Sequence, residues 1–379
     1  MTHSSAVALT QALVRQNTIN PPGNERRCAD ILARRLEDNG FSVTMVGFGE
    51  GRASLVARIG GREGTLPIAF TGHIDTVPLG MRDWTQDPFG GDIDGDRLYG
   101  RGSSDMKAGV AAFVEACIAH RATLESGPGA LLVITAAEET GCEGAFHLCN
   151  QPGLLGKAGA LVVAEPTSNQ PLVGHKGALW LRAVAEGVTA HGSMPEKGDN
   201  AVAKAARAVV KLGDFDFNER RHEVLGRPTL NVGTFHGGIN VNSVPDRAEI
   251  GLDIRTVPGQ THARVTEALG SYLGTEVAVA PIIDVEAVWT DPEDAWIRRV
   301  FAIMAPLLSE PPVVQGASYF TDASALTPAL GGLPTVILGP GEAAMAHQTD
   351  EYCLVSRIDQ AVEAYGRIIE DWCEDRCKP

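Results

Sequence analysis

Two histidines and several carboxylates in this chain have the types and the placement that divalent metal ions require. His73 and Asp75 stand two residues apart at the end of the apolar run 67–70. On a strand, residues at that spacing point to the same side. His73 can therefore bind a metal through one ring nitrogen while Asp75, or a backbone group beside it, holds the other. By itself, such a pair more often marks only the polar end of a strand, where the chain leaves the sheet.

Other acidic residues also follow apolar segments. Glu138 and Glu139 come after the run 131–135, and Glu165 follows the run 161–164. In an open α/β sheet, ligands bind at the carboxyl ends of the strands. We therefore expect these side chains to gather at one edge of a sheet.

Two more candidates lie outside the predicted strands. Asp105 stands at the start of a predicted helix over 106–120, and His347 lies in a predicted loop. Imidazoles and carboxylates together suit a borderline-soft divalent ion such as zinc, and a carboxylate that bridges two ions holds them about 3.5–4 Å apart. On a loop, one of the adjacent acids Glu138 and Glu139 can be a ligand while the other acts as a general base.

The length and the strand pattern predict two domains. A chain of 379 residues exceeds the usual size of one domain. The pattern of predicted secondary structure changes between about residues 176 and 286, where strand-like runs alternate with helical runs. The strands are predicted at 178–185, 229–235 and 248–254, and the helices near 200–212 and 261–273. Two strand-helix-strand units of this size suit a small α+β domain inserted into a larger one.

The composition restricts the possible partners and the compartment. The net charge of −15 argues against a nucleic-acid partner, because no broad basic surface is available to face phosphates. No apolar run approaches the length of a membrane span, and no secretory leader is recognisable. The cysteines are odd in number and include no Cys-x-x-Cys pair, so we expect a reducing, cytoplasmic location. They are Cys28, Cys117, Cys142, Cys149, Cys353, Cys373 and Cys377.

Taken together, the motifs resemble those of the M20 family of co-catalytic zinc peptidases and deacylases. The matching segments run in family order over nearly the whole chain: 72–78 (GHIDTVP), 84–89 (WTQDPF), 100–107 (GRGSSDMK), 138–141 (EETG), 164–166 (AEP), 190–193 (AHGS), 253–255 (DIR) and 346–347 (AH). A single motif of this kind would be weak, whereas all of them in order are specific.

The resemblance implies a fold and a metal site. The fold would be α/β, with a mixed-sheet catalytic domain over residues 1–175 and 289–379. An inserted ferredoxin-like α+β domain over residues 176–288 would serve as a lid and a dimerisation domain. His73 and Glu165 would hold one Zn²⁺, Glu139 and His347 the other, and Asp105 would bridge them; Co²⁺ or Mn²⁺ could substitute. The family also has a cis peptide after the bridging aspartate, here Asp105-Met106.

The resemblance also implies catalytic and substrate-binding roles. Asp75 would orient His73, and Glu138 would move the proton from water to the leaving amine. His191 would stabilise the oxyanion, typically in the active site of the partner subunit of a homodimer. Arg255 and Asn242 would bind the substrate, and Thr321 matches a substrate-side turn less specifically. Arg255 could equally be a solvated arginine at the end of a strand.

The expected activity is hydrolysis of an N-acyl amino acid to a free amino acid and a carboxylic acid. Within the family, acetylornithine deacetylase or succinyl-diaminopimelate desuccinylase would be the commonest assignment, and no residue identifies the acyl group. An aminoacylase acting on amino-acid conjugates, a dipeptidase and a carboxypeptidase are the alternatives within the enzyme class. A non-catalytic metal-binding protein is a more remote alternative, because Glu138 and the full set of ligands are present.

Overall fold

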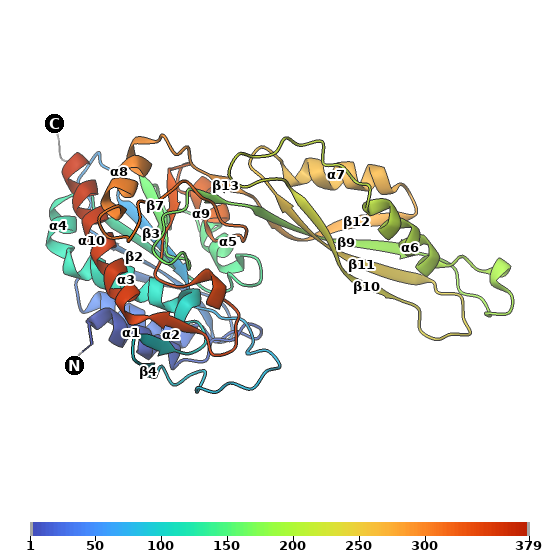
Figure 1. Cartoon of the computed structure of the whole chain (residues 1–379), viewed down its shortest axis with the longest axis horizontal. Helices are drawn as coiled ribbons and strands as arrows, with labels where there is room; N and C mark the ends of the chain where they lie inside the picture. Colours follow the sequence, from blue (N-terminus) through green and yellow to red (C-terminus); the bar gives the residue numbers. More distant parts are fainter. Residues whose placement is uncertain (1–2, 377–379) are drawn as a thin grey trace. The chain divides into compact units, whose positions relative to one another are not determined.

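The structure is a computed structural model that describes residues 3–376 (Figure 1). The chain divides into two compact units. The main unit comprises the chain up to Gly174, the segment Trp289–Gln315 and the chain from Thr321 onward. The inserted unit comprises His175–Val288 together with the short segment Gly316–Phe320, which the sequence analysis assigned to the larger domain.

A six-stranded mixed sheet forms the centre of the main unit. Its strand order is β1-β2-β6-β3-β7-β14. Strands β6, β3, β7 and β14 run parallel to one another, whereas β2 runs antiparallel to β6 and β1 antiparallel to β2. The strands are β1 (Ser42–Gly49), β2 (Arg52–Ile59), β3 (Ile68–His73), β6 (Ala130–Thr135), β7 (Ala160–Val163) and β14 (Thr335–Ile337). The predicted mixed α/β class is confirmed.

Helices cover the two faces of this sheet. Figure 1 shows α3 and α10 on one side and α5 and α9 on the other. The helices of the main unit are α1 (Ser5–Val14), α2 (Arg26–Glu37), α3 (Ala108–Ala119), α4 (Arg121–Ser126), α5 (Glu143–Cys149), α8 (Ala295–Met304), α9 (Ala323–Ala329) and α10 (Val355–Arg376). Strands β3, β6 and β7 are buried along their whole length, as expected for strands that are covered on both faces.

Aromatic packing joins the central strand to two of these helices. Phe70 of β3 stacks on Phe113 of α3 with ring centroids 5.8 Å apart. It also meets Tyr365 of α10 edge to face at 5.6 Å. Because Phe70 lies three residues before His73, this packing holds the strand end that carries the first candidate ligand.

Short elements complete the main unit. Strands β4 (Ile93–Asp94) and β5 (Arg97–Tyr99) form an antiparallel hairpin, and β15 (Tyr352–Leu354) pairs with β5. Two further short elements are η1 (Ser103–Lys107) and η3 (Ala343–Met345). The predicted cis peptide at Asp105-Met106 is present.

The inserted unit is a four-stranded antiparallel sheet with two helices packed on one face (Figure 1). Its chain order is β9 (Gly177–Glu186), α6 (Ala201–Leu212), β10 (Thr229–Gly237), β11 (Arg247–Thr256), α7 (His262–Leu273) and β12 (Val277–Val285), with η2 (Pro195–Lys197) after β9. This β-α-β-β-α-β order confirms the predicted ferredoxin-like class.

The sequence analysis did not predict strand β12. This strand lies at the edge of the sheet, and its pairing with β9 is interrupted between Pro281 and Ile283. Proline lacks a backbone N–H and weakens the strand signal, and it is tolerated here because an edge strand has one unpaired side. Strands β8 (Gly174–His175) and β13 (Val288–Trp289) lie where the chain passes between the units.

The cysteines and the helices bear on two predictions from the sequence, a reducing location and the lack of a membrane-spanning segment. The described cysteines are all free thiols, and Cys377 lies outside the described residues. Within residues 3–376, none of the helices combines the length and the apolar character that crossing a bilayer demands.

The start of α3 packs directly against the end of β7, so we predict that Gly109→Ala destabilises the protein. A Cβ atom at Gly109 would lie 2.1 Å from the carbonyl oxygen of Ala164, which forces the helix and the strand apart. Overpacking of this kind lowers the free energy of unfolding by about 1–3 kcal/mol. Urea denaturation followed by circular dichroism measures it.

Gly270→Ala in helix α7 is the matched control. A Cβ atom there meets nothing within 4 Å, so the better helix propensity of alanine should raise the free energy of unfolding by up to about 1 kcal/mol. Equal stabilisation by both substitutions would contradict the close contact between α3 and β7.

Candidate metal centre

Three neighbouring parallel strands deliver candidate ligands to one edge of the main sheet. His73 is the last residue of β3, which lies between β6 and β7. Glu138 and Glu139 follow the end of β6, and Glu165 follows the end of β7. Because the carboxyl ends of parallel strands meet at the same edge, these residues lie close together, as the sequence predicts.

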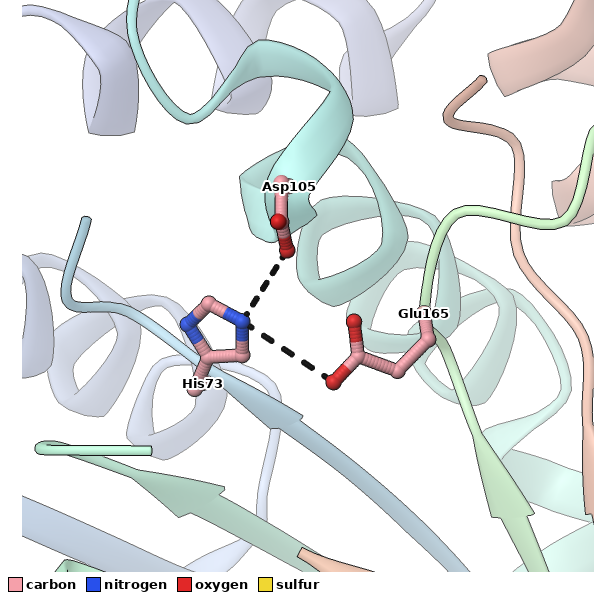
Figure 2. Close-up of side chains that lie close together, drawn as sticks. All are labelled: His73, Asp105 and Glu165. Carbon is pink, nitrogen blue, oxygen red and sulfur yellow. Dashed lines mark hydrogen bonds and ion pairs between the residues drawn. The ribbon is translucent and has the colours of Figure 1, made fainter. Parts of the chain in front are cut away.

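Asp105, in the loop before α3, completes a first group of ligands with His73 and Glu165. Asp105 Oδ1 lies 3.2 Å from His73 Nε2, and Glu165 Oε1 lies 3.9 Å from the same nitrogen (Figure 2). One ligand atom from each of the three residues lies within 4.8 Å of the others. All three side chains point toward one position, as ligands of a single ion do.

His347 and Glu139 form a second group that shares Asp105 with the first. His347 Nε2 lies 3.2 Å from Glu139 Oε2 and 3.5 Å from Asp105 Oδ2. Asp105 therefore presents one carboxylate oxygen to each group, which is the arrangement of a bridging ligand. The five predicted metal ligands thus come together as two groups with one common member.

A backbone group, rather than the carboxylate, makes the hydrogen bond that orients His73. His73 Nδ1 lies 3.0 Å from the carbonyl oxygen of Asp75, and the nearest carboxylate oxygen of Asp75 is 3.4 Å away. A carbonyl oxygen only accepts hydrogen bonds, so Nδ1 carries a proton, and Nε2 is the ring nitrogen that can bind a metal ion. The structure thus favours the backbone alternative that the sequence analysis left open.

The Asp75 carboxylate instead holds the turn that carries the two glutamates. Its oxygens accept hydrogen bonds from the backbone N–H of Glu138 at 3.1 Å and of Glu139 at 3.2 Å. The side-chain amide of Asn20 donates a third hydrogen bond at 3.0 Å. One buried carboxylate therefore ties the end of β3 to the turn after β6.

Burial and mutual repulsion perturb the carboxylates of the cluster. Burial raises the pKa of Glu138, Glu139 and Glu165, and the negative charges of neighbouring carboxylates raise each pKa further. Hydrogen bonds with Asp105 and Glu139 raise the pKa of His347 to about 10.

Divalent cations fit this arrangement. Glu139 Oε1 is buried and has no hydrogen-bond partner among the described residues. Uncompensated buried charge and an unpaired buried oxygen are both costly. Ions held by these oxygen and nitrogen donors would remove both costs, and the donor types are those that zinc accepts.

Glu138 and Asp322 lie beside the two groups. Glu138 Oε2 is 4.0 Å from His73 Nε2, and the Cys142 thiol donates a hydrogen bond to Glu138 Oε1 at 3.9 Å. Asp322 accepts a hydrogen bond from the hydroxyl of Thr135 at the end of β6. Burial raises the pKa of Asp322 to about 6, and its negative charge in turn raises the pKa of Glu138.

The remaining predicted site residues are divided between the main unit and the inserted unit. Thr321 is buried, and its hydroxyl accepts a hydrogen bond from the N–H of Ala323 at 3.1 Å at the start of α9. His191, Asn242 and Arg255 belong to the inserted unit. Within that unit the loops of His191 and Asn242 lie side by side, because the N–H of Gly192 donates to the carbonyl oxygen of Asn242 at 2.7 Å.

Arg255 is paired with its own strand neighbour. Its Nε lies 2.9 Å from Asp253 Oδ1, and its Nη2 lies 3.2 Å from Asp253 Oδ2. The pair is partly exposed at the surface of β11, so a ligand carboxylate could replace Asp253 as its partner at little cost.

A third cluster, in the inserted unit, has a structural explanation. His262 lies near Asp284 and Glu286. Its Nδ1 is 2.6 Å from Asp284 Oδ1, and its Nε2 is 2.8 Å from the hydroxyl of Thr256. Because both ring nitrogens are engaged, this is a hydrogen-bonded core histidine rather than a metal ligand.

Sequence reasoning missed Asn20, which shapes the site. Asn20 lies between two helices in a segment with two prolines and has no motif of its own, so the sequence offers no signal for it. Asp322 belongs with Thr321 to the turn that the family resemblance indicates, and the structure adds that its side chain is buried.

Comparison with known proteins agrees with this geometry. Residues 69–371 match the family described as Peptidase family M20/M25/M40. The chain belongs to this family. This M20 protein is 33% identical to the acetylornithine deacetylase of Proteus mirabilis (strain HI4320), over 91% of this chain and 89% of that protein. It is 32% identical to a succinyl-diaminopimelate desuccinylase of Cereibacter sphaeroides, over 97% of this chain and 98% of that protein.

A solved structure supports the fold. An M20 family metallo-carboxypeptidase from Sulfolobus solfataricus aligns with a TM-score of 0.80 and 19% identity, over 98% of this chain and 100% of the other. The family match and the two relatives confirm the predicted family, and the chain is a metal-dependent hydrolase of the M20 type.

The shared position of Asp105 leads to a prediction about how many ions the protein binds. Chelator-stripped protein should bind two Zn²⁺ per chain, because two ligand groups are present. His347→Ala should weaken the binding of one ion, whereas Asp105→Ala should weaken both, since Asp105 belongs to both groups. Isothermal titration calorimetry with Zn²⁺ measures the number of ions and each affinity.

His236→Ala is the control, because His236 is an exposed histidine of the inserted unit outside both groups. It should bind two ions like the parent protein. Loss of only one ion in Asp105→Ala would contradict the bridging assignment.

Proposed function

We propose that this M20 protein hydrolyses the amide bond of N-acyl amino acids and releases a free amino acid and a carboxylic acid. The observation that carries the proposal is the position of Glu138 beside two ligand groups that share Asp105. Its relatives named acetylornithine deacetylase and succinyl-diaminopimelate desuccinylase, at 33% and 32% identity, support this substrate class.

The ligand groups suit two zinc ions. His73 and Glu165 would hold one, Glu139 and His347 the other, and Asp105 would bridge them. Bound there, the ions would polarise the scissile carbonyl and acidify the attacking water. Cobalt or manganese could occupy the same donors.

Glu138 suits the role of general base and then general acid. It is buried, it lies at the edge of the cluster, and its pKa is raised well above the ordinary carboxyl value by burial. A raised pKa makes the protonated form accessible, so Glu138 can accept a proton from water and pass it to the leaving amine. Asp75 positions this residue through the backbone of the turn.

The inserted unit would supply substrate recognition. Arg255 would bind the α-carboxylate of the substrate through two parallel hydrogen bonds. In the structure, the Asp253 carboxylate accepts from the same two nitrogens. His191 is exposed, and its Nδ1 is hydrogen bonded to Ser193 Oγ at 2.8 Å, so Nε2 is the ring nitrogen that would contact the oxyanion. Asn242, in the adjacent loop, would contribute a further hydrogen bond; Thr321 would act through the turn that it caps.

We further propose a homodimer formed through the inserted unit. Strand β10 is at the edge of its sheet. Its end and the loop that follows expose three apolar side chains, Phe235, Ile239 and Val241. An edge strand with exposed apolar residues is a surface that a second copy can cover. A cytoplasmic location completes the proposal, in keeping with the free thiols.

The substrate class is tested by the rate of amine release from a panel of N-acetyl-, N-succinyl- and N-aroyl-amino acids and dipeptides. Zinc-restored cleavage of the acylated amino acids is the expected result. Cleavage confined to dipeptides would favour the peptidase alternative. No cleavage anywhere, with two ions bound, would favour the non-catalytic alternative.

On the best substrate, Glu138→Gln should lower kcat by about 10²–10⁴-fold, because it removes the general base. Metal binding should persist, since Glu138 is not one of the proposed ligands. Glu143→Gln, an exposed glutamate five residues later, is the control and should keep full activity. Full turnover of Glu138→Gln with metal bound would refute the assignment of the base.

Mixing two inactive variants tests whether His191 acts in the partner's active site. Glu138→Gln and His191→Ala chains are each expected to be impaired. A mixed dimer contains one active site with Glu138 from one chain and His191 from the other, so activity should reappear after subunit exchange. Activity equal to the sum of the separate variants, or a fully active monomer in sedimentation, would refute the role in trans.

A further inference from the structure

Glu351 is a buried carboxylate that the proposed reaction does not use. It lies in the main unit, four residues after His347, and its side chain is fully buried. Its two oxygens accept four hydrogen bonds, all from a single loop. Oε2 accepts from Arg101 Nη1 at 2.7 Å and from the N–H of Gly102 at 2.9 Å. Oε1 accepts from the N–H of Ser104 at 2.9 Å and of Asp105 at 3.0 Å.

These hydrogen bonds reach the residue that both ligand groups share. The N–H of Asp105 itself is bonded to Glu351, so the backbone that carries the bridging side chain is held directly. Two further hydrogen bonds tie the same segments together. Ser104 Oγ donates to the carbonyl oxygen of Tyr352 at 2.7 Å, and the N–H of Gly100 donates to the carbonyl oxygen of Glu351 at 2.8 Å.

Arg101 compensates the charge of Glu351. It is buried as well, its guanidinium lies 5.0 Å from the ring centroid of Trp84, and its Nη2 donates to the carbonyl oxygen of Pro78 at 3.2 Å. Consecutive backbone N–H groups that converge on one point form an anion site. Here a carboxylate of the chain fills that site, and the arginine pairs with it, so the buried charge is both hydrogen bonded and neutralised.

The loop that carries His347 is anchored at a second point. Asp350 accepts hydrogen bonds from the N–H of Thr85 at 2.8 Å and of Gln86 at 3.2 Å, and from Thr85 Oγ1 at 2.8 Å. The segment 347–351 therefore carries a candidate ligand at one end and anchors at the other. Glu351 links this segment to the Asp105 loop, and thus links the sources of two candidate ligands.

We propose that Glu351 is a positioning residue for the metal centre. By filling the N–H site of residues 102–105 it sets the position of Asp105 before any ion binds, so that one carboxylate oxygen faces each ligand group. The inference rests on the ligand assignment of the proposed function. It adds a residue that touches neither the substrate nor the ions.

Glu351→Gln tests the inference. Glutamine keeps the shape but has one acceptor oxygen and an amide that only donates, so two of the four donors lose their acceptor. Loss of such an outer partner typically lowers metal affinity by about 10–100-fold. Competition of chelator-stripped protein with a fluorescent zinc chelator measures the affinity, and the absorption spectrum of the Co²⁺-loaded protein reports the ligand geometry. Excess Zn²⁺ should restore activity.

Glu115→Gln is the matched control. Glu115 is also buried in the main unit and pairs with Arg35 through two hydrogen bonds of 2.8 Å between helices α3 and α2, away from the Asp105 loop. Both substitutions break the pairing of a buried carboxylate with an arginine, so both should lower thermal stability. Only Glu351→Gln should lower zinc affinity and change the Co²⁺ spectrum. Unchanged affinity in folded Glu351→Gln would overturn the inference.

Amide hydrogen exchange of the unmodified protein gives a second test that needs no variant. The amides of Gly102, Ser104 and Asp105 should exchange slowly in chelator-stripped protein, because Glu351 holds them without an ion. Fast exchange that slows only when zinc is added would overturn the inference. If the unmodified protein bound no zinc, the proposed function would fail instead, which keeps the two failures distinguishable.

Discussion

The accumulation of buried carboxylates at one edge of the main sheet is the constraint on which the rest of the structure depends. Five acids gather there with two imidazoles: Asp105, Glu138, Glu139, Glu165 and Asp322. Burial, and after it the charges of neighbouring carboxylates, raises the pKa of each of these acids except Asp105, so their charged forms are unfavourable when no cation is present. Such a cluster does not stabilise the fold by itself, so its explanation is the binding of positively charged ions.

The scaffold meets this constraint through rigid connections rather than through the ligands themselves. Aromatic packing holds β3, the contact of Gly109 with Ala164 fits α3 against β7, and the Asp75 carboxylate holds the turn after β6. Each connection acts on backbone close to a ligand. A site assembled from five separate segments needs such connections, because an error of a fraction of an ångström in one segment would separate the donors.

The two units divide the candidate residues between them. The metal-binding groups and Glu138 all belong to the main unit, whereas Arg255, Asn242 and His191 belong to the inserted unit. With the roles proposed above, hydrolysis and recognition would vary separately, since the metal groups require fixed distances while recognition depends on loops and strand surfaces.

The sequence by itself determined the family, the mixed α/β class and the candidate ligands. The order of the motifs identifies the family, and His73, Glu139 and Glu165 follow apolar strands whose ends meet at one edge. Only the tertiary structure decided how neighbouring groups divide their work: the backbone of Asp75 orients His73, while its carboxylate holds the glutamates. It also revealed Asn20 and Glu351, whose partners lie 55 and 246 residues away along the chain. Contacts over such separations leave no periodicity in the sequence, since they depend on how loops approach one another after the core has formed.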